Sequence, residues 1–151
     1  LSRLEGSSKP AAFFEDDFRT LTQDEVQHVL AVYSWQREEL LAGLEFMPEA
    51  SYNRAEQRTG KTIPVMVSQM ALDCYDILAA LKSPLPPFPT RNEAFAQLDF
   101  TTELIRGTLP AWAGVEAICE VSGELWSPRK AIRHLLWRQR KGIEQIKALV
   151  G

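Results

Sequence analysis

The chain has 151 residues, of which 45% are apolar, so it is long enough and apolar enough to fold as one globular domain. A net charge of -3 and an isoelectric point near 5.5 argue against binding nucleic acid or an anionic membrane through bulk electrostatics. No apolar run approaches the roughly 20 residues that a membrane-spanning helix needs. The two cysteines, Cys74 and Cys119, form no metal-ligand or redox motif, which indicates a reducing, cytoplasmic location.

Residues 1–20 are expected to form a linker and an N-terminal arm, and residues 21–151 the folded domain. Gly, Ser and Pro in the stretch 6–10 disfavour regular structure. Three phenylalanines then occur within six residues: Phe13, Phe14 and Phe18. Each would cost about 1.5–3 kcal/mol to leave in water, so we expect this arm to pack on the domain or on a neighbouring chain. The chain begins at Leu1 and not at Met, and we expect either a homodimer or attachment to an upstream domain.

Two helices are predicted in the first half of the domain, each beginning at a threonine cap. Thr22 and Glu25 form a capping box, so the first helix should run from there to about residue 45. Apolar residues at helical spacing mark its inward face: Val26, Val29, Leu30, Tyr33, Leu40, Leu41 and Leu44. Trp35 lies on the opposite side, so it should be covered by the phenylalanine arm or form a dimer contact. After a loop over 46–61, Thr62 should cap the second helix.

The second helix is followed by a proline-rich connection and a third helix. Its inward stripe is expected to contain Met66, Met70, Asp73, Ile77 and Ala80, with Gln69 at the edge. Four prolines within 83–89 predict a stiff, extended connection. Thr90 should then open a third helix that Pro110 ends. Its inward residues are expected to be Phe95, Leu98, Thr102, Ile105 and Leu109.

The stretch 113–125 has no helical stripe, and we predict an extended crossover there. Ser127 and Pro128 are typical of a helix start, which predicts a fourth helix over 128–149. Its apolar face should contain Ile132, Leu135, Leu136, Gln139, Ile143, Ile146 and Val150, flanked on one side by Ala131, Arg138 and Gly142. Four long helices and a long crossover predict an all-α, up-down-type four-helix bundle.

Several short segments resemble, in their order and spacing, the DinB/YfiT-like family of four-helix bundles. The segments are EDDFR at 15–19, LLAGL at 40–44, GKTI at 60–63 and GELWSPRK at 123–130. The last of these opens a run with the pattern Trp-Ser-x-Arg and a second tryptophan, from Trp126 to Trp137. Together they extend over roughly residues 15–148.

The resemblance implies a nickel or zinc ion held by one histidine from the second helix and two from the fourth. It also implies, for several members, thiol-dependent S-transferase or isomerase activity. At the corresponding positions this chain has Gln69, Arg138 and Gly142. An amide oxygen is a poor ligand for these metals, a guanidinium has no lone pair to donate, and glycine has no side chain. A three-histidine site is therefore not expected, and we assign no metal ligand, no cofactor and no catalytic residue.

The candidate pocket is the cavity in which the metal of such a family would lie. Gln69, Asp73, Arg138 and Gly142 should line it, with His134 near its rim as a surface or boundary residue. We expect Arg138 to pair with Asp73 across the cavity, with Gln69 as a hydrogen-bond neighbour; the alternative is that both charges are solvated. The space at Gly142 and the charge of Arg138 predict a small anionic ligand such as a carboxylate.

Other residues with chemical potential have simpler interpretations. Cys74 follows a carboxylate in mid-helix, so we expect a buried, inert thiol. The acidic cluster at 15–17 should be a solvated tip. Trp126 and Trp137 should cover the ends and flanks of the bundle or contribute to a dimer interface. The last helix carries a basic run, of which Arg133, Arg140 and Lys141 should face solvent: Arg129, Lys130, Arg133, Arg138, Arg140 and Lys141.

The leading interpretation is a non-catalytic or small-ligand-binding DinB-like domain that has lost its metal site. One alternative is a metal-dependent thiol S-transferase-like enzyme with a rearranged site that uses His134 and Asp73. Another is a protein-interaction module that acts through the phenylalanine arm, Trp35 and Trp137. The expected partners are a small anion and a second copy or an upstream domain, with no nucleic acid and no membrane.

Overall fold

The structure is a computed structural model that describes residues 15–55 and 60–150, without the side chain at 150. Its elements are η1 (Glu15–Phe18), α2 (Gln23–Leu44), α3 (Glu49–Tyr52), α4 (Ile63–Ala79), α5 (Ala94–Thr108), η2 (Leu109–Trp112), β1 (Cys119–Val121), β2 (Glu124–Trp126) and α6 (Pro128–Val150). Phe13, Phe14 and the inward position expected for Val150 lie outside the description. The predicted all-α class is confirmed, since the described chain is mostly helical and its two strands are short.

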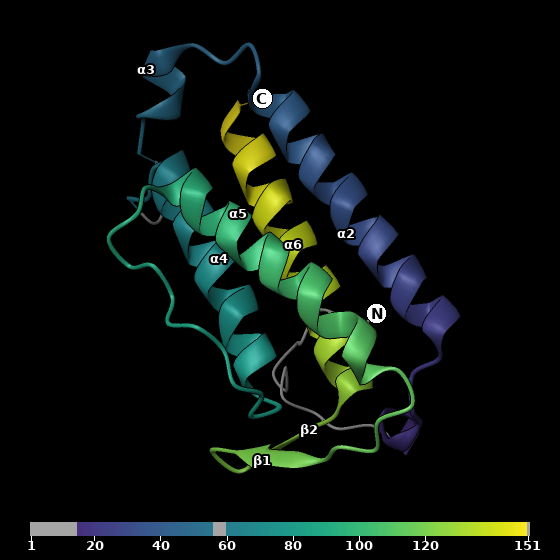
Figure 1. The fold of residues 1–151 in the computed structure, drawn as a ribbon. Coiled ribbons are helices and arrows are strands. Elements are labelled where there is room, and N and C mark those ends of the chain that lie inside the picture. The colour runs from purple at the N-terminus through teal and green to yellow at the C-terminus, as the bar shows by residue number, and fades with distance from the viewer. Residues whose placement is uncertain (1–14, 56–59, 151) are drawn as a thin grey trace.

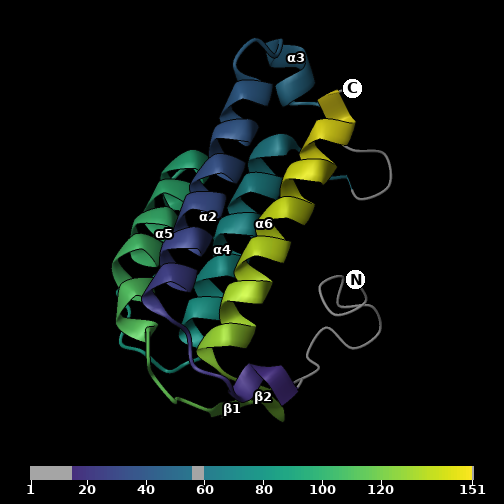
Figure 2. The ribbon, with the colours of Figure 1, turned by 90° about the vertical axis from the view of Figure 1, so that its right-hand side faces the viewer.

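The four long helices of the described chain, α2, α4, α5 and α6, lie side by side (Figures 1 and 2). Helix α4 packs against both α5 and α6, and α6 also packs against α2. The β1–β2 hairpin and η1 lie near one end of this assembly, and α3 lies at the other end (Figure 1). None of the described helices is both long enough and apolar enough to cross a membrane.

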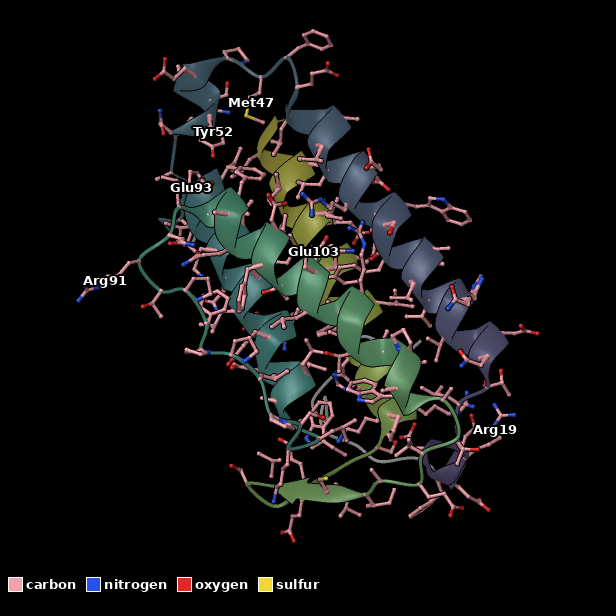
Figure 3. The ribbon with its side chains drawn as sticks, in the orientation of Figure 1. Arg19, Met47, Tyr52, Arg91, Glu93 and Glu103 are labelled. Carbon is pink, nitrogen blue, oxygen red and sulfur yellow. The ribbon has the colours of Figure 1, made fainter. Side chains whose placement is uncertain are left out.

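The helix starts follow from side-chain capping. The capping box of α2 is confirmed, since the Glu25 amide donates to Thr22 Oγ1 at 3.1 Å and the Thr22 amide to Glu25 Oε1 at 3.0 Å. Thr62 caps α4 as predicted. The predicted start of α5 at Thr90 is wrong: the carboxylate of Glu93 accepts hydrogen bonds from the amides of residues 95 and 96, so this helix begins after Glu93 (Figure 3).

The crossover before α6 contains a hairpin that the sequence analysis did not predict. Strands β1 and β2 pair antiparallel, with Cys119 opposite Trp126. Ser122 and Gly123 form the two-residue turn, with φ values of 53° and 82°. Two successive positive φ angles are typical of the turns that join antiparallel strands, which explains the glycine at this point. Three further short elements were also missed: η1, η2 and, within the predicted 46–61 loop, α3.

The buried apolar side chains form two clusters along the length of the helices. One lies toward the hairpin and includes Val26, Val29, Tyr33, Leu78, Ile105, Leu109 and Leu135. The other includes Leu40, Ile63, Met66, Met70, Leu98, Ile143 and Ile146. A polar link joins α6 to α2: Gln139 Nε2 donates to the Tyr33 carbonyl at 2.9 Å and to Gln36 Oε1 at 2.8 Å. The predicted inward position of Gln139, which is 1% exposed, is thereby confirmed.

Ion pairs change two expectations about charged residues. Asp17 is 1% exposed and not part of a solvated tip, because Arg133 Nη1 lies 2.7 Å from its Oδ1 and Arg133 Nη2 lies 3.2 Å from its Oδ2. Basic side chains of α6 likewise form ion pairs and do not simply face solvent. Arg129 pairs with Glu25, and Arg140 pairs with Glu39, each through two hydrogen bonds. These pairs fasten α6 to the first part of the chain.

Candidate functional site

Helices α4 and α6 enclose a cavity of about 140 Å³, called here the α4–α6 cavity. Its lining consists of Lys61, Met66, Gln69, Met70, Asp73, Arg138, Lys141, Gly142 and Gln145. Four of the five residues predicted for the candidate pocket, all except His134, therefore lie around one cavity. On α6 the lining positions 141 and 142 follow 138 by three and four residues, and 145 follows them by four and three, which places all four on one helical face.

The expected contact between Arg138 and Asp73 is present. Arg138 Nη1 lies 3.7 Å from Asp73 Oδ2, and Gln69 Nε2 donates to Asp73 Oδ1 at 2.9 Å. The pair is only partly buried, since the Arg138 side chain is 40% exposed and the Asp73 side chain is 25% exposed. A partly exposed ion pair at this distance contributes no more than about 1 kcal/mol, so a ligand can exchange with it at little cost.

The expected empty space at Gly142 is filled by a neighbouring side chain. A Cβ atom at this position would meet Met70 Sδ at 2.6 Å and Met70 Cγ at 3.2 Å. Met70 thus occupies the volume into which a side chain at position 142 would project. The α4–α6 cavity lies beside this contact and extends toward the charged residues.

Cationic side chains outnumber carboxylates among the described residues that line the α4–α6 cavity. These residues include Arg138, Lys141 and Lys61, with one carboxylate, that of Asp73. Arg138 Cζ lies 5.1 Å and Lys141 Nζ lies 5.2 Å from the ring centroid of Trp137, so the ring positions both cations. The buried Nε of Arg138 has no hydrogen-bond partner among the described residues. The guanidinium of Arg138 is therefore incompletely hydrogen-bonded by the described residues.

His134 is buried, which corrects the expected surface or boundary position. It is 7% exposed, and its ring lies 5.1 Å from that of Trp126 and 6.4 Å from that of Trp137. Trp126 belongs to β2 of the hairpin, so a strand that the sequence analysis did not predict contributes to the burial of His134. Burial, followed by the charges of Arg133, Lys130 and Arg138, lowers the pKa of His134 from 6.5 to about 4. The imidazole is therefore neutral at pH 7.

His134 lines a second cavity, of about 360 Å³, between α4, the hairpin and α6; it is called here the hairpin cavity. Its lining consists of Asp73, Asp76, Ile77, Ala80, Val121, Ser122, Glu124, Trp126, His134 and Arg138. Asp73 and Arg138 line both cavities, so the two cavities meet at this ion pair. The predicted pocket is thus divided into two compartments, with His134 in the second.

The residues at the predicted metal positions do not fit a nickel or zinc ion. Gln69, Arg138 and Gly142 supply one amide, one cation and no side chain at the third position. His134 and Asp73 do line the same cavity. Within residues 15–55 and 60–150, however, no group of three or more His, Cys, Asp or Glu side chains is placed to bind a metal.

The thiol of Cys74 is buried in the core. It is 0% exposed, and burial raises its pKa to about 12. A thiol with such a pKa is protonated at neutral pH and is a weak nucleophile. The predicted burial of Cys74 is confirmed, and the side chain faces neither cavity.

Sequence analysis missed several residues of the site. Lys61 and Gln145 of the α4–α6 cavity were not singled out, and Lys141 was expected to face solvent. The spacing of Arg138, Lys141 and Gln145 on one helix was the available signal. Asp76 and Glu124 of the hairpin cavity were also missed, since their proximity depends on the hairpin.

Comparisons with known proteins give no relative: the chain has no significant match to any protein-family model, curated protein or solved structure.

Proposed function

We propose that this chain is a DinB-like four-helix bundle of the up-down type whose metal site has been replaced by a binding site for a small carboxylate. The packing of α4 against α5 and α6, and of α6 against α2, supports the bundle. The resemblance is supported further by the position of Gln69, Arg138 and Gly142 around one cavity. The proposal assigns no catalytic residue, and the role is ligand binding.

The observation on which this proposal rests is the unused donor capacity of Arg138 in a cavity lined by further cations. A guanidinium binds a carboxylate through two parallel hydrogen bonds, which are stronger than neutral ones. The Arg138–Asp73 contact at 3.7 Å is too long for such a bond, so the guanidinium can turn toward a ligand. Lys141, also on the lining, adds a second positive charge.

The size of the α4–α6 cavity restricts the ligand. Pockets for drug-sized molecules usually exceed about 300 Å³, whereas this one holds about 140 Å³. Met66 and Met70 form the apolar part of its lining. A carboxylate on a short aliphatic chain matches this combination of charge, apolar surface and volume.

The test compares thermal unfolding in acetate, propionate, pentanoate and chloride at equal ionic strength. We expect at least one carboxylate to raise the melting temperature of the native chain, because a ligand that binds only the folded state stabilises it. Arg138→Met should abolish this rise. Arg106→Met is the matched control, since Arg106 is exposed on α5 and pairs with Glu103 outside the cavity. An equal rise in all three proteins, or no rise with any carboxylate, would contradict the proposal.

A second candidate function is a protein contact through α2 and the turn after it. Trp35 is 67% exposed and Phe46 is 89% exposed, which is unusual for such large apolar side chains. Sedimentation equilibrium of the native chain and of Trp35→Ser tests this candidate. Self-association that Trp35→Ser removes would support it, and a monomer at all concentrations would exclude a homodimer through this face.

A further inference from the structure

The hairpin cavity has the opposite electrostatic character to the α4–α6 cavity. Asp73 and Asp76 of α4 and Glu124 of β2 line it, and Arg138 is the one cation among the described lining residues. The carboxylates come from two elements that are far apart in sequence. These carboxylates favour a positively charged ligand, whereas Lys130, whose Nζ lies 4.3 Å from the Trp126 ring centroid, and Arg133 oppose it.

His134 gives an independent indication of a ligand. The side chain lines the hairpin cavity and is 7% exposed, and its Nε2 atom has no hydrogen-bond partner in the described part of the chain. Buried polar atoms in native proteins nearly always have a partner. A neutral imidazole nitrogen accepts a hydrogen bond, which an N–H donor on a ligand would supply.

The ion pair between the two cavities couples them. Asp73 and Arg138 line both, and their contact is long and partly exposed. When a carboxylate binds Arg138 in the α4–α6 cavity, Asp73 loses Arg138 as its ion-pair partner. The negative charge of Asp73 is then no longer compensated by Arg138. This charge then faces the hairpin cavity, where it favours a cation. Binding of an anion and binding of a cation therefore reinforce one another.

We propose that the hairpin cavity binds an organic ammonium group, and that the two cavities together bind a zwitterion with its carboxylate and its ammonium at opposite ends of a short chain. The binding of the carboxylate end of this zwitterion depends on the proposed function. An ammonium has three N–H donors, and the lining offers three acceptors for them: the carboxylates of Asp76 and Glu124 and the imidazole of His134.

The test is isothermal titration of the full chain with ω-amino acids of three to six carbons, and with the monocarboxylate and the monoamine of each length. We expect at least one ω-amino acid to bind about tenfold or more tightly than both of its monofunctional counterparts. Glu124→Gln should weaken the binding of amines and of the ω-amino acid by about tenfold, the usual effect of removing a charged hydrogen-bond partner. It should leave carboxylate binding unchanged.

Two further variants make this test specific. Asp76→Asn should weaken the binding of amines and of the ω-amino acid as Glu124→Gln does. Because Asp76 lies on α4, agreement between the two variants excludes a local effect of Glu124→Gln on the hairpin. Glu116→Gln removes an exposed carboxylate outside both cavity linings and should change nothing. The inference is overturned if no ω-amino acid exceeds its counterparts, or if amine binding is insensitive to both cavity variants.

The outcomes separate this inference from the proposed function. Carboxylate binding that depends on Arg138, without any amine binding, overturns the ammonium site and leaves the proposed function standing. Amine binding that depends on Glu124, without any carboxylate binding, supports the ammonium site and contradicts the proposed function and the zwitterion. Zinc chloride is titrated alone and in competition with the amine. Zinc binding that excludes the amine would make the hairpin cavity a metal site and overturn the ammonium assignment.

Discussion

The buried imidazole of His134 makes the stability of the fold depend on pH. In the folded chain its pKa is about 4, because burial and the charges of Arg133, Lys130 and Arg138 oppose protonation. In the unfolded chain the side chain takes up a proton below a pH of about 6.5. The unfolded state therefore binds more protons between pH 6.5 and 4, so the free energy of unfolding falls as the pH is lowered through this window. Above it the contribution is fully present.

The magnitude follows from the two pKa values. Each pH unit between them corresponds to about 1.36 kcal/mol, so the change from 6.5 to about 4 amounts to about 3 kcal/mol. About 2 kcal/mol of this should be lost between pH 7 and pH 4.5. The carboxyl of Glu25, whose pKa the Arg129 side chain lowers to about 2, loses its stabilising effect only below this interval.

The assay is urea unfolding at pH 7 and at pH 4.5 for the native chain, for His134→Gln and for His28→Gln, an exposed control. The native chain and the control should lose about 2 kcal/mol more than His134→Gln over this interval. An equal loss in all three proteins would refute the reasoning. The pKa of the imidazole would then be the same in the folded and the unfolded chain.

Three further predictions concern packing and burial. Asp17→Asn should lower the free energy of unfolding by about 3 kcal/mol, because it removes the buried carboxylate charge that pairs with Arg133; a loss below 1 kcal/mol in urea unfolding would contradict this. Gly142→Ala should change the free energy of unfolding more favourably, by about 1–2 kcal/mol, in a Met70→Ala background than in the native chain, because the added Cβ meets Met70 Sδ. A double-mutant cycle that shows no coupling between the two positions would contradict this and would show that Met70 moves freely. Cys74 should resist alkylation by iodoacetamide until the chain unfolds, and rapid modification of the folded protein would contradict its burial.

The helical part of the fold was predictable because its signals are local. Thr22 and Glu25 form their capping box within one turn, and the apolar spacing of α6 identified most of the face that the structure buries. The start of α5 was wrong because Glu93 caps the helix with its own carboxylate three residues after the expected threonine. The hairpin was missed because two strands of three residues each are too short to show an alternating pattern.

The site was predictable where it depends on positions along single helices, and not where it depends on contacts between distant segments. Arg138 faces Asp73 because both lie on the facing sides of α4 and α6, which helical spacing shows. The burial of His134 depends on Trp126 in the hairpin, and the burial of Asp17 depends on an ion pair across 116 residues. Neither contact leaves a periodic pattern in the sequence.

The central claim, that Arg138 binds a small carboxylate, is tested most directly by the side-chain Nε–H resonances of arginine in a ¹⁵N-labelled sample. The Arg138 signal is assigned by its loss in Arg138→Lys, and the native protein is titrated with pentanoate against chloride at equal ionic strength. Because the buried Nε–H of Arg138 lacks a partner within the described chain, we expect its signal to shift and saturate with pentanoate while other arginine signals stay in place. An unchanged Arg138 signal at saturating pentanoate would contradict the account.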